Sequence, residues 1–204
     1  MQHALQLAEP PLAALPFADY TYPASDWNGL VLVGEAPGAE EARQGKPFVG
    51  RSGQLLDKIL EKARIERAAC IVANCFRHQP PGNKVDHFFI SKRASTTGNI
   101  AMAEEYGKFG SAYCRAEYAP DIAYLGKMLA KHNPRLVVAL GRTPLWALTG
   151  EGGLLGKVGK LLPCRLAPSL QVLPTFHPSF ILRGNWKLQD EWQDHFALAA
   201  KYNL

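Results

Sequence analysis

Residues 30–56 read LVLVGEAPGAEEARQGKPFVGRSGQLL, and this stretch predicts how the rest of the chain is arranged. Its first four residues are apolar and partly β-branched, which favours a buried parallel strand. The segment GEAPG then ends the strand in a tight turn, because glycine and proline suit such backbone. Apolar residues at helical spacing follow Ser52, a suitable N-cap. A strand, a turn and a helix in this order are typical of an open α/β sheet with a ligand at the strand end.

The rest of the chain repeats this alternation. Short apolar strands are expected at residues 69–73, 136–140 and 171–173, and helices at residues 121–132, 143–148 and 185–202, the second capped by Thr143. The pattern predicts a three-layer α/β/α fold with a central four-stranded parallel sheet. We expect residues 1–204 to form a single domain. It would carry an N-terminal wrapping segment at residues 1–27, with a short helix, and an insertion at about residues 84–118, with a weak helix near residues 101–108.

Composition narrows the class of protein. A chain of 204 residues with 47% hydrophobic and 20% charged residues can bury a sizeable core. Its net charge of +5 favours an anionic partner, although a solvated basic surface would give the same balance. No basic residue precedes Arg43 and no long apolar run occurs, so we expect an intracellular protein without a membrane anchor. Four scattered cysteines fit reduced thiols better than disulfides or a zinc site.

Three polar residues follow three of the predicted strands. They are Glu35, Asn74 and His177. Because the carboxyl ends of parallel strands share one edge of a sheet, these side chains are expected to converge. Each also has an ordinary structural interpretation, since Glu35 can cap a turn, Asn74 can satisfy loop amides and His177 can bond its own loop. Their combination favours a functional site.

Four segments carry a resemblance to a known family. GEAPGAEEARQGKPFVGRSGQLL, NCFRHQPPGNK, VVALGRTPLWAL and TFHPSFILRGN occur in the order of the motifs of the uracil-DNA glycosylase superfamily. The chain most closely resembles its family-four branch, over residues 30–183 apart from the insertion. The resemblance implies a monofunctional base excision repair enzyme that flips uracil out of DNA and hydrolyses its N-glycosidic bond, leaving an abasic site. It implies uracil-containing DNA as partner, a monomer, and a cytoplasmic, nucleoid-associated location without membrane contact.

The resemblance assigns a base pocket to two side chains and the glycine-rich turn. The ring of Phe48 would stack on the flipped base, unless it is a core aromatic under the loop. The amide of Asn74 would accept from uracil N3–H and donate to O4. Gly34, Ala36 and Gly38 would complete the pocket, with backbone amides available to the base or a phosphate. Gly38 stands where the uracil-strict branch has a bulky Tyr, so other deaminated bases are also expected as substrates.

The resemblance also assigns the catalytic residues. His177 would stabilise the negative charge that develops on uracil O2, and Glu35 would position or activate the attacking water. In the best-known branch the water-directing carboxylate is an Asp one place later, where this chain has Ala36. Glu40 and Glu41 therefore stay open as alternatives to Glu35.

The segment after His177 is assigned to DNA binding. Ser179, Ile181, Leu182 and Arg183 follow in the place where these enzymes push a side chain into the duplex. Leu182 is the first choice for this apolar wedge, and Arg183 would grip a phosphate. The alternative is that Ile181 and Leu182 simply begin the next helix.

The chain departs from the family-four pattern in its cysteines. Members of that branch usually carry a four-cysteine iron–sulfur cluster, but residues 1–27 contain no cysteine. The other two ligand positions fall on His78 and Asp121, and Cys114 is alone nearby. We therefore expect no iron–sulfur cluster, no other cofactor and no metal site. His78 and Asp121 are hypothesised to form a hydrogen-bonded or charged pair.

Two other functions are compatible with parts of the sequence. The first is a uracil- or DNA-binding module of the same fold with little or no catalysis. The second is a nucleotide-phosphate enzyme that uses the glycine-rich turn, which is the weaker alternative because GEAPG lacks the lysine of a P-loop.

Overall fold

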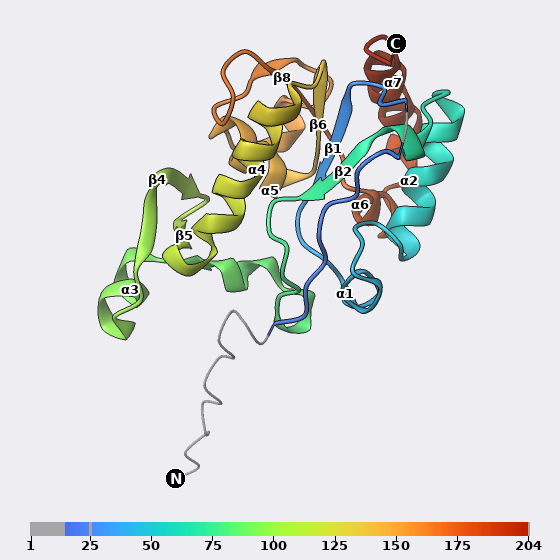
Figure 1. Cartoon of the computed structure of the whole chain (residues 1–204). Helices are drawn as coiled ribbons and strands as arrows, with labels where there is room; N and C mark the ends of the chain where they lie inside the picture. Colours follow the sequence, from blue (N-terminus) through green and yellow to red (C-terminus); the bar gives the residue numbers. More distant parts are fainter. Residues whose placement is uncertain (1–14, 25, 204) are drawn as a thin grey trace.

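The central feature of the structure, a computed structural model that describes residues 15–24 and 26–203, is a five-stranded sheet (Figure 1). Its order is β2 (Ile71–Asn74), β1 (Leu30–Gly34), β6 (Leu136–Leu140), β8 (Gln171–Thr175) and β7 (Leu162–Pro163). The first four strands are parallel, and β7 pairs antiparallel with β8 at the edge. The expected four-stranded parallel sheet is thus extended by one strand, whose two residues are too few to give a readable pattern.

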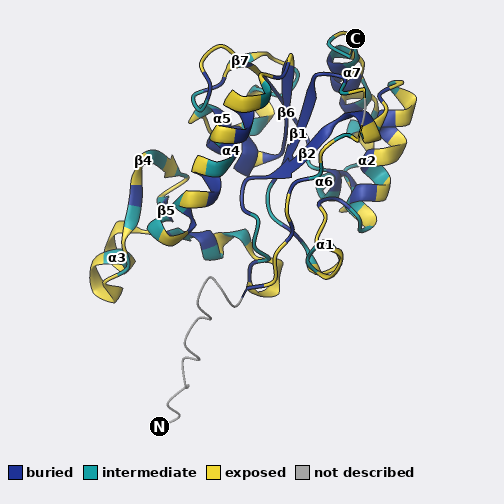
Figure 2. Cartoon of the chain, viewed as in Figure 1, coloured by how far each residue is buried: buried dark blue, intermediate teal, exposed yellow. Residues whose placement is uncertain are grey.

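Helices cover both faces of this sheet. One face carries α2 (Arg51–Lys62), α6 (Pro178–Leu182) and α7 (Gln189–Ala200), and the other carries α4 (Ala119–His132) and α5 (Arg142–Thr149) (Figure 1). Strands β1, β2 and β6 are buried throughout, because an apolar run can pack on helices from both sides (Figure 2). Successive residues alternate between the two cores: Val31 packs with α4, and Leu32 packs with α2 and α7.

Shorter helices lie in the connections. The loop after β1 contains α1 (Ala39–Gln44), which the sequence pattern missed because none of its residues is buried. Helix α2 begins one residue before Ser52, with Gly50 at the N-cap, and Gly141 rather than Thr143 caps α5. The 3₁₀ turns are η2 (Arg67–Ala69), η3 (Pro81–Asn83), η4 (Val85–Phe88), η5 (Ala116–Tyr118), η6 (Leu154–Gly156) and η7 (Trp186–Leu188).

The insertion forms a small sheet of its own. It contains β3 (Phe89–Ile90), α3 (Lys92–Gly98), β4 (Met102–Phe109) and β5 (Ala112–Arg115), with strand order β3-β5-β4 and antiparallel pairing. The weak helix expected near residues 101–108 is wrong, because pairing with β5 overrides local helix preference.

Aromatic side chains fasten the insertion to the body of the protein. The rings of Phe76 and Phe88 stack with centroids 4.1 Å apart, and those of Phe89 and Phe109 stack at 4.4 Å. Phe89 also meets Trp146 of α5 edge to face at 5.2 Å. Phe88 and Phe89 therefore anchor the insertion to the body of the protein.

The described part of the N-terminal segment runs along the sheet. Phe17 pairs with His78, and Thr21 pairs with Val72 of β2, each as an isolated bridge. Residues 15–24 contain no helix, and residues 1–14 of the segment expected to hold a short helix lie outside the described residues. None of the helices in residues 15–24 and 26–203 is both long and apolar enough to cross a membrane.

Candidate active site

The parallel strands bring the three polar strand-end residues to one cavity. Gly34 at the end of β1 is in register with Asn74 at the end of β2, and β8 delivers His177 to the same edge. Glu35, Asn74 and His177 all line a cavity of about 430 Å³. Further lining residues that the sequence analysis named are Ala36, Gly38, Glu40, Glu41, Phe48, Ser179 and Arg183.

Gly34 makes room for the two side chains that form the inner wall. A Cβ atom at this position would clash with the amide oxygen of Asn74 and the ring of Phe48. Phe48 is 5% exposed, its backbone is left-handed with φ 55°, and its ring centroid lies 5.7 Å from that of His177. Asn74 is 3% exposed, yet its side-chain amide makes no hydrogen bond to any of the described residues. Its donor and its acceptor are therefore available to a ligand.

Glu35 is held by a residue of α5. The hydroxyl of Thr143, which is fully buried, donates to Glu35 Oε2 at 2.5 Å. Burial raises the pKa of Glu35, and the Thr143 hydrogen bond and the charges of Arg142 and Arg183 oppose that rise. Glu35 is thus a desolvated carboxylate with an oriented oxygen, which suits a general base.

The hydrogen bonds of His177 define its tautomer. His177 is the N-cap of α6, and its Nδ1 accepts from the backbone N–H of Ser179 at 3.1 Å. The Ser179 hydroxyl lies 2.8 Å from the same nitrogen. Because Nδ1 is an acceptor, the proton of the neutral ring is on Nε2. Burial, together with the positive charge of Arg183, lowers the pKa of His177 to about 4, so the ring is a neutral Nε2–H donor at physiological pH.

The two other acidic residues of the turn have structural partners. Glu41 Oε1 accepts from the backbone N–H groups of Val49 and Gly50 at 3.0 and 2.8 Å, which fixes the loop that carries Phe48. Glu40 is exposed and pairs with Arg43 at 2.7 Å. These contacts favour Glu35 over Glu40 and Glu41 as the carboxylate that acts on a ligand.

The residues assigned to DNA binding separate into two groups. Ser179 and the exposed Arg183 line the cavity. Ile181 is fully buried in the core beneath α6, so its side chain does not reach a surface where DNA could bind. Leu182 is half-buried. The alternative interpretation, that these two residues belong to a packed helix, describes Ile181 correctly.

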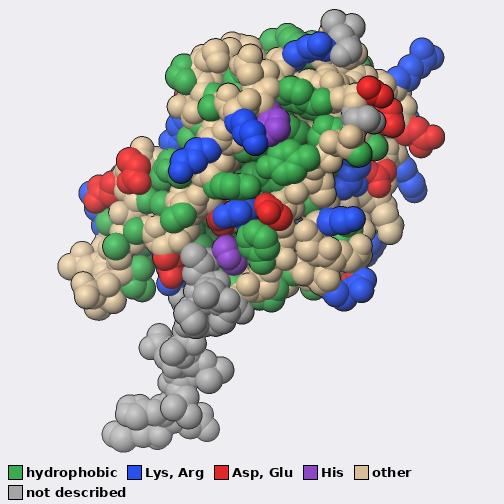
Figure 3. Space-filling model, in the orientation of Figure 1, with side chains coloured by type: hydrophobic (Ala, Val, Ile, Leu, Met, Phe, Trp, Pro, Cys, Tyr) green, Lys and Arg blue, Asp and Glu red, His purple; other side chains and the backbone are tan. Residues whose placement is uncertain are grey.

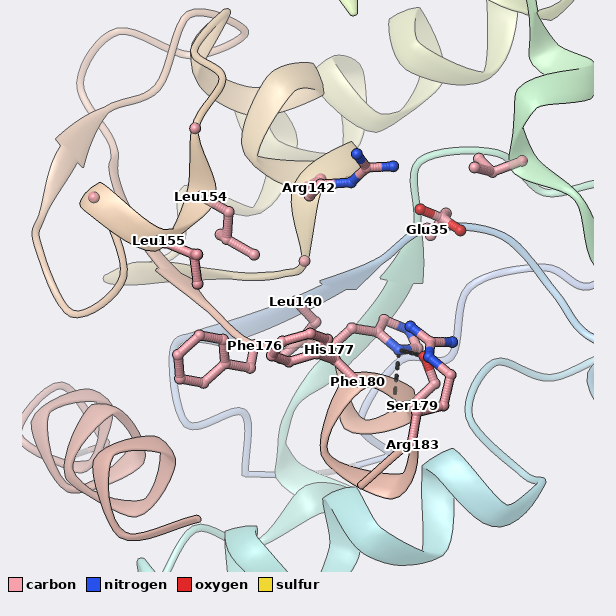
Figure 4. A pocket seen from close by; sticks show the side chains of 14 residues that line it. Glu35, Leu140, Arg142, Leu154, Leu155, Phe176, His177, Ser179, Phe180 and Arg183 are labelled. Carbon is pink, nitrogen blue, oxygen red and sulfur yellow. Dashed lines mark hydrogen bonds between the residues drawn. The ribbon is translucent and has the colours of Figure 1, made fainter. Parts of the chain in front are cut away.

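A second cavity, of about 700 Å³, adjoins the first and shares Glu35, His177, Ser179 and Arg183 with it. In Figure 4, Arg142 lies near Glu35 at its rim, and apolar side chains line the remainder. These are Leu140, Leu154, Leu155, Phe176 and Phe180. Figure 3 shows hydrophobic side chains interspersed with Lys and Arg on one face of the molecule. Sequence reasoning missed Arg142, although its position just after β6 follows the same strand-end rule as Glu35.

The hypothesised pair of His78 and Asp121 is present. His78 Nδ1 lies 3.2 Å from Asp121 Oδ2, and Arg77 donates to Asp121 through its backbone N–H and its Nε, both at 2.9 Å. Burial alone would raise the pKa of Asp121, but the hydrogen bonds from His78 and Arg77 outweigh it and lower that pKa. The cluster joins the segment after β2 to the first turn of α4.

Comparisons with known proteins show the family to which the chain belongs. Residues 25–200 match the model of the family described as the Uracil DNA glycosylase superfamily. A type-4 uracil-DNA glycosylase of Thermotoga maritima is 30% identical over 76% of this chain and 67% of its own length. One from Pyrobaculum aerophilum is also 30% identical, over 83% and 76%, and one from Archaeoglobus fulgidus is 26% identical, over 82% and 73%.

These relatives contradict the expectation that the chain has no cofactor. They are named type-4 enzymes, the class for which the resemblance implies an iron–sulfur cluster. The prediction rested on the cysteines missing from residues 1–27 and on His78 and Asp121 at the other two ligand positions. The side chains in the described ranges do not fit a four-thiolate group. The four cysteines, Cys70, Cys75, Cys114 and Cys164, are free and buried, and no three His, Cys, Asp or Glu side chains there are grouped as metal ligands. The chemistry of the cavity is accordingly derived from its own side chains.

Proposed function

Because the chain belongs to the uracil-DNA glycosylase superfamily, we propose that it removes uracil from DNA by hydrolysing the N-glycosidic bond, in base excision repair. The observation that carries this proposal is the convergence of four groups on one cavity. They are the Phe48 ring, the Asn74 amide, the His177 ring and the Glu35 carboxylate. Three of these groups can bind the base, and the fourth, Glu35, can bind the attacking water.

Recognition of the base is assigned to Asn74 and Phe48. The amide oxygen of Asn74 accepts from uracil N3–H, and its NH₂ group donates to O4, while the base stacks on the Phe48 ring. Cytosine presents an acceptor at N3 and a donor at C4, so both contacts would be mismatched. A buried polar group left without a partner costs about 1–3 kcal/mol, which is enough to favour uracil.

Cleavage is assigned to His177 and Glu35. As the bond between C1′ and N1 breaks, its electron pair moves onto the base, and the Nε2–H of His177 donates to O2 where negative charge accumulates. The water oxygen then bonds to C1′ and the carboxylate of Glu35 accepts the water proton. A neutral His177 suits this role, because it stabilises the charge on O2 without having to give up its proton.

Binding of the DNA backbone is assigned to the arginine side chains at the rim of the larger cavity. Arg142 and Arg183 are exposed, and both line the larger cavity beside the catalytic pair. Phosphate contacts from such side chains position the duplex without reading its sequence. The protein is proposed to act as a monomer, since one open rim suffices for one strand.

The range of bases that the cavity accepts is proposed to depend on Gly38. It lines the base cavity and brings no side chain that would exclude a 5-methyl group. We include other deaminated or 5-substituted bases among the proposed substrates for this reason.

The test is alkali-revealed strand cleavage of end-labelled oligonucleotides that each carry one uracil, hypoxanthine, xanthine or thymine mismatch. Wild type should cleave at uracil, and Asn74→Ala, His177→Ala and Glu35→Gln should each lose most of that activity. Glu61→Gln, on the exposed face of α2, is the matched control for Glu35→Gln and should cleave normally. If the purified protein binds uracil-containing DNA but releases no base, the binding-module alternative replaces this proposal.

A further inference from the structure

A glycine-rich loop next to the catalytic pair presents a leucine to solvent. The sequence from residue 150 to residue 156 is GEGGLLG, and its second leucine, Leu155, is 73% exposed. Among the described residues it is the most exposed large hydrophobic side chain. Leu155 lines the larger cavity together with Glu35, His177 and Arg183. Figure 4 shows Leu154 and Leu155 on one side of this cavity, with Phe176 and Phe180 on the other.

The loop holds Leu155 in a defined position. Residues 154–156 form the 3₁₀ turn η6, which Gly153 enters with a left-handed φ of 68°. The backbone N–H of Lys157 donates to Leu154 O at 2.9 Å, and that of Gly159 donates to Pro174 O of β8 at 2.9 Å. An ion pair of 3.0 Å between Lys157 and Glu151 closes the base of the loop. These contacts fix the backbone that presents Leu155 at the rim of the cavity.

The residues expected to enter the duplex are less well placed for it. Ile181 is fully buried, and Leu182 is half-buried on a helix that packs in the same core. Either side chain would have to give up packing in order to reach between bases. Leu155 is already exposed and gives up little packing by entering DNA.

We propose that Leu155 is the side chain that enters the base stack when the target base leaves it, a role that rests on the proposed function. An apolar wedge of this kind offsets part of the cost of unstacking a duplex. Arg142 and Arg183 lie at the rim of the same cavity, where they can hold the phosphates around the inserted leucine. The partner is therefore double-stranded DNA, since a single strand has no stack that must be kept open.

The experiment compares Leu155→Ala with wild type on a single-stranded uracil oligonucleotide and on duplexes containing U:A or U:G pairs, in single-turnover assays. We expect Leu155→Ala to lose about tenfold or more of the rate on U:A, less on the weaker U:G pair, and less than about twofold on the single strand. Leu155→Met should restore the duplex rate. Leu161→Ala is the matched control, because Leu161 is 38% exposed and lines neither cavity.

A second measurement does not depend on catalysis. The base analogue 2-aminopurine, placed beside the uracil in a duplex, becomes brighter when it is unstacked, so wild type should raise its fluorescence on binding and Leu155→Ala should not. The proposal is overturned if Leu155→Ala behaves as wild type in this measurement. It is also overturned if Leu182→Ala, and not Leu155→Ala, loses activity on duplexes alone. Failure of the proposed function would instead appear as absence of base release from the single strand by wild type.

Discussion

Replacing Thr143 by valine removes the hydroxyl that donates to the carboxylate of Glu35 but keeps the size of the side chain. Thr143 is fully buried, and its hydroxyl donates to Glu35 Oε2 at 2.5 Å. A hydrogen bond to a charged group contributes about 1.5–3 kcal/mol. The bond stabilises the ionised form of Glu35, so losing it should raise the pKa of this carboxyl. Burial already raises that pKa, and the substitution should raise it further.

The consequence is a displaced pH–rate profile. In the proposed mechanism Glu35 is an ionised base, so activity should be lost as the pH falls through its pKa, and a higher pKa moves this acid limb to higher pH. We expect kcat/KM of Thr143→Val to fall at the acid end of the pH range and to recover toward the wild-type value as the pH rises. Thr143→Ser keeps the donor and should keep the wild-type profile.

The assay is uracil release from a single-stranded oligonucleotide between pH 5 and pH 9, with a thermal melt of each variant at both ends of the range. Thr149→Val is the control, since Thr149 lies on the same helix but donates to the backbone O of Leu145 at 2.7 Å. A uniform loss of rate at every pH, without movement of the acid limb, would show that Thr143 serves packing only and would refute the reasoning.

Four further outcomes follow from the site and its surroundings. The ring of His177 should titrate in NMR near pH 4 rather than near 6.5, because burial lowers its pKa, and His177→Ala should lose about 10²–10³ in kcat. Gly34→Ala should abolish uracil release while DNA affinity persists in a gel-shift assay, because its Cβ would clash with Asn74 and Phe48. Arg183→Ala should reduce by about 0.9 the slope of log affinity against log salt if it holds one phosphate. Asp121→Asn should lower the free energy of unfolding in urea by about 1–3 kcal/mol at pH 7. Since the folded-state pKa of Asp121 is depressed, this difference should be present above its unfolded pKa and shrink as the pH falls through the folded pKa.

The sheet and the cavity could be predicted because they follow from strong local rules. A continuous apolar run such as residues 30–33 has few alternatives to a buried strand, and parallel strands place their carboxyl ends together. Glu35, Asn74 and His177 were found by that rule alone, and the resemblance added Phe48. Their roles in recognition and cleavage are proposals that mutagenesis must test.

What the sequence missed depends on contacts distant in the chain. Strand β4 is stabilised by β5 across a turn, so its own residues suggested a helix. Thr143 read as an N-cap, and only the fold shows its hydroxyl bonded to Glu35, 108 residues away. In the sequence Leu155 does not differ from other loop residues, and only the fold shows that it is exposed beside the site. The prediction of no cofactor was wrong because it gave more weight to the cysteines missing from the expected ligand positions than to the class of the relatives.

Burial shifts the pKa values of Glu35 and His177 in opposite directions. Desolvation disfavours charge, so it raises the pKa of the Glu35 carboxyl and lowers that of the His177 ring. The Thr143 hydrogen bond and the neighbouring arginines limit the rise of the Glu35 pKa, whereas Arg183 adds to the fall of the His177 pKa. The proposed mechanism uses both effects, with Glu35 as the base for the water and neutral His177 as the donor to the departing base. Because the charge of Arg183 lowers both pKa values, removing it should raise both and favour the protonated form of each group. Phosphate binding by Arg183 at the rim would therefore be linked to the charge states of Glu35 and His177.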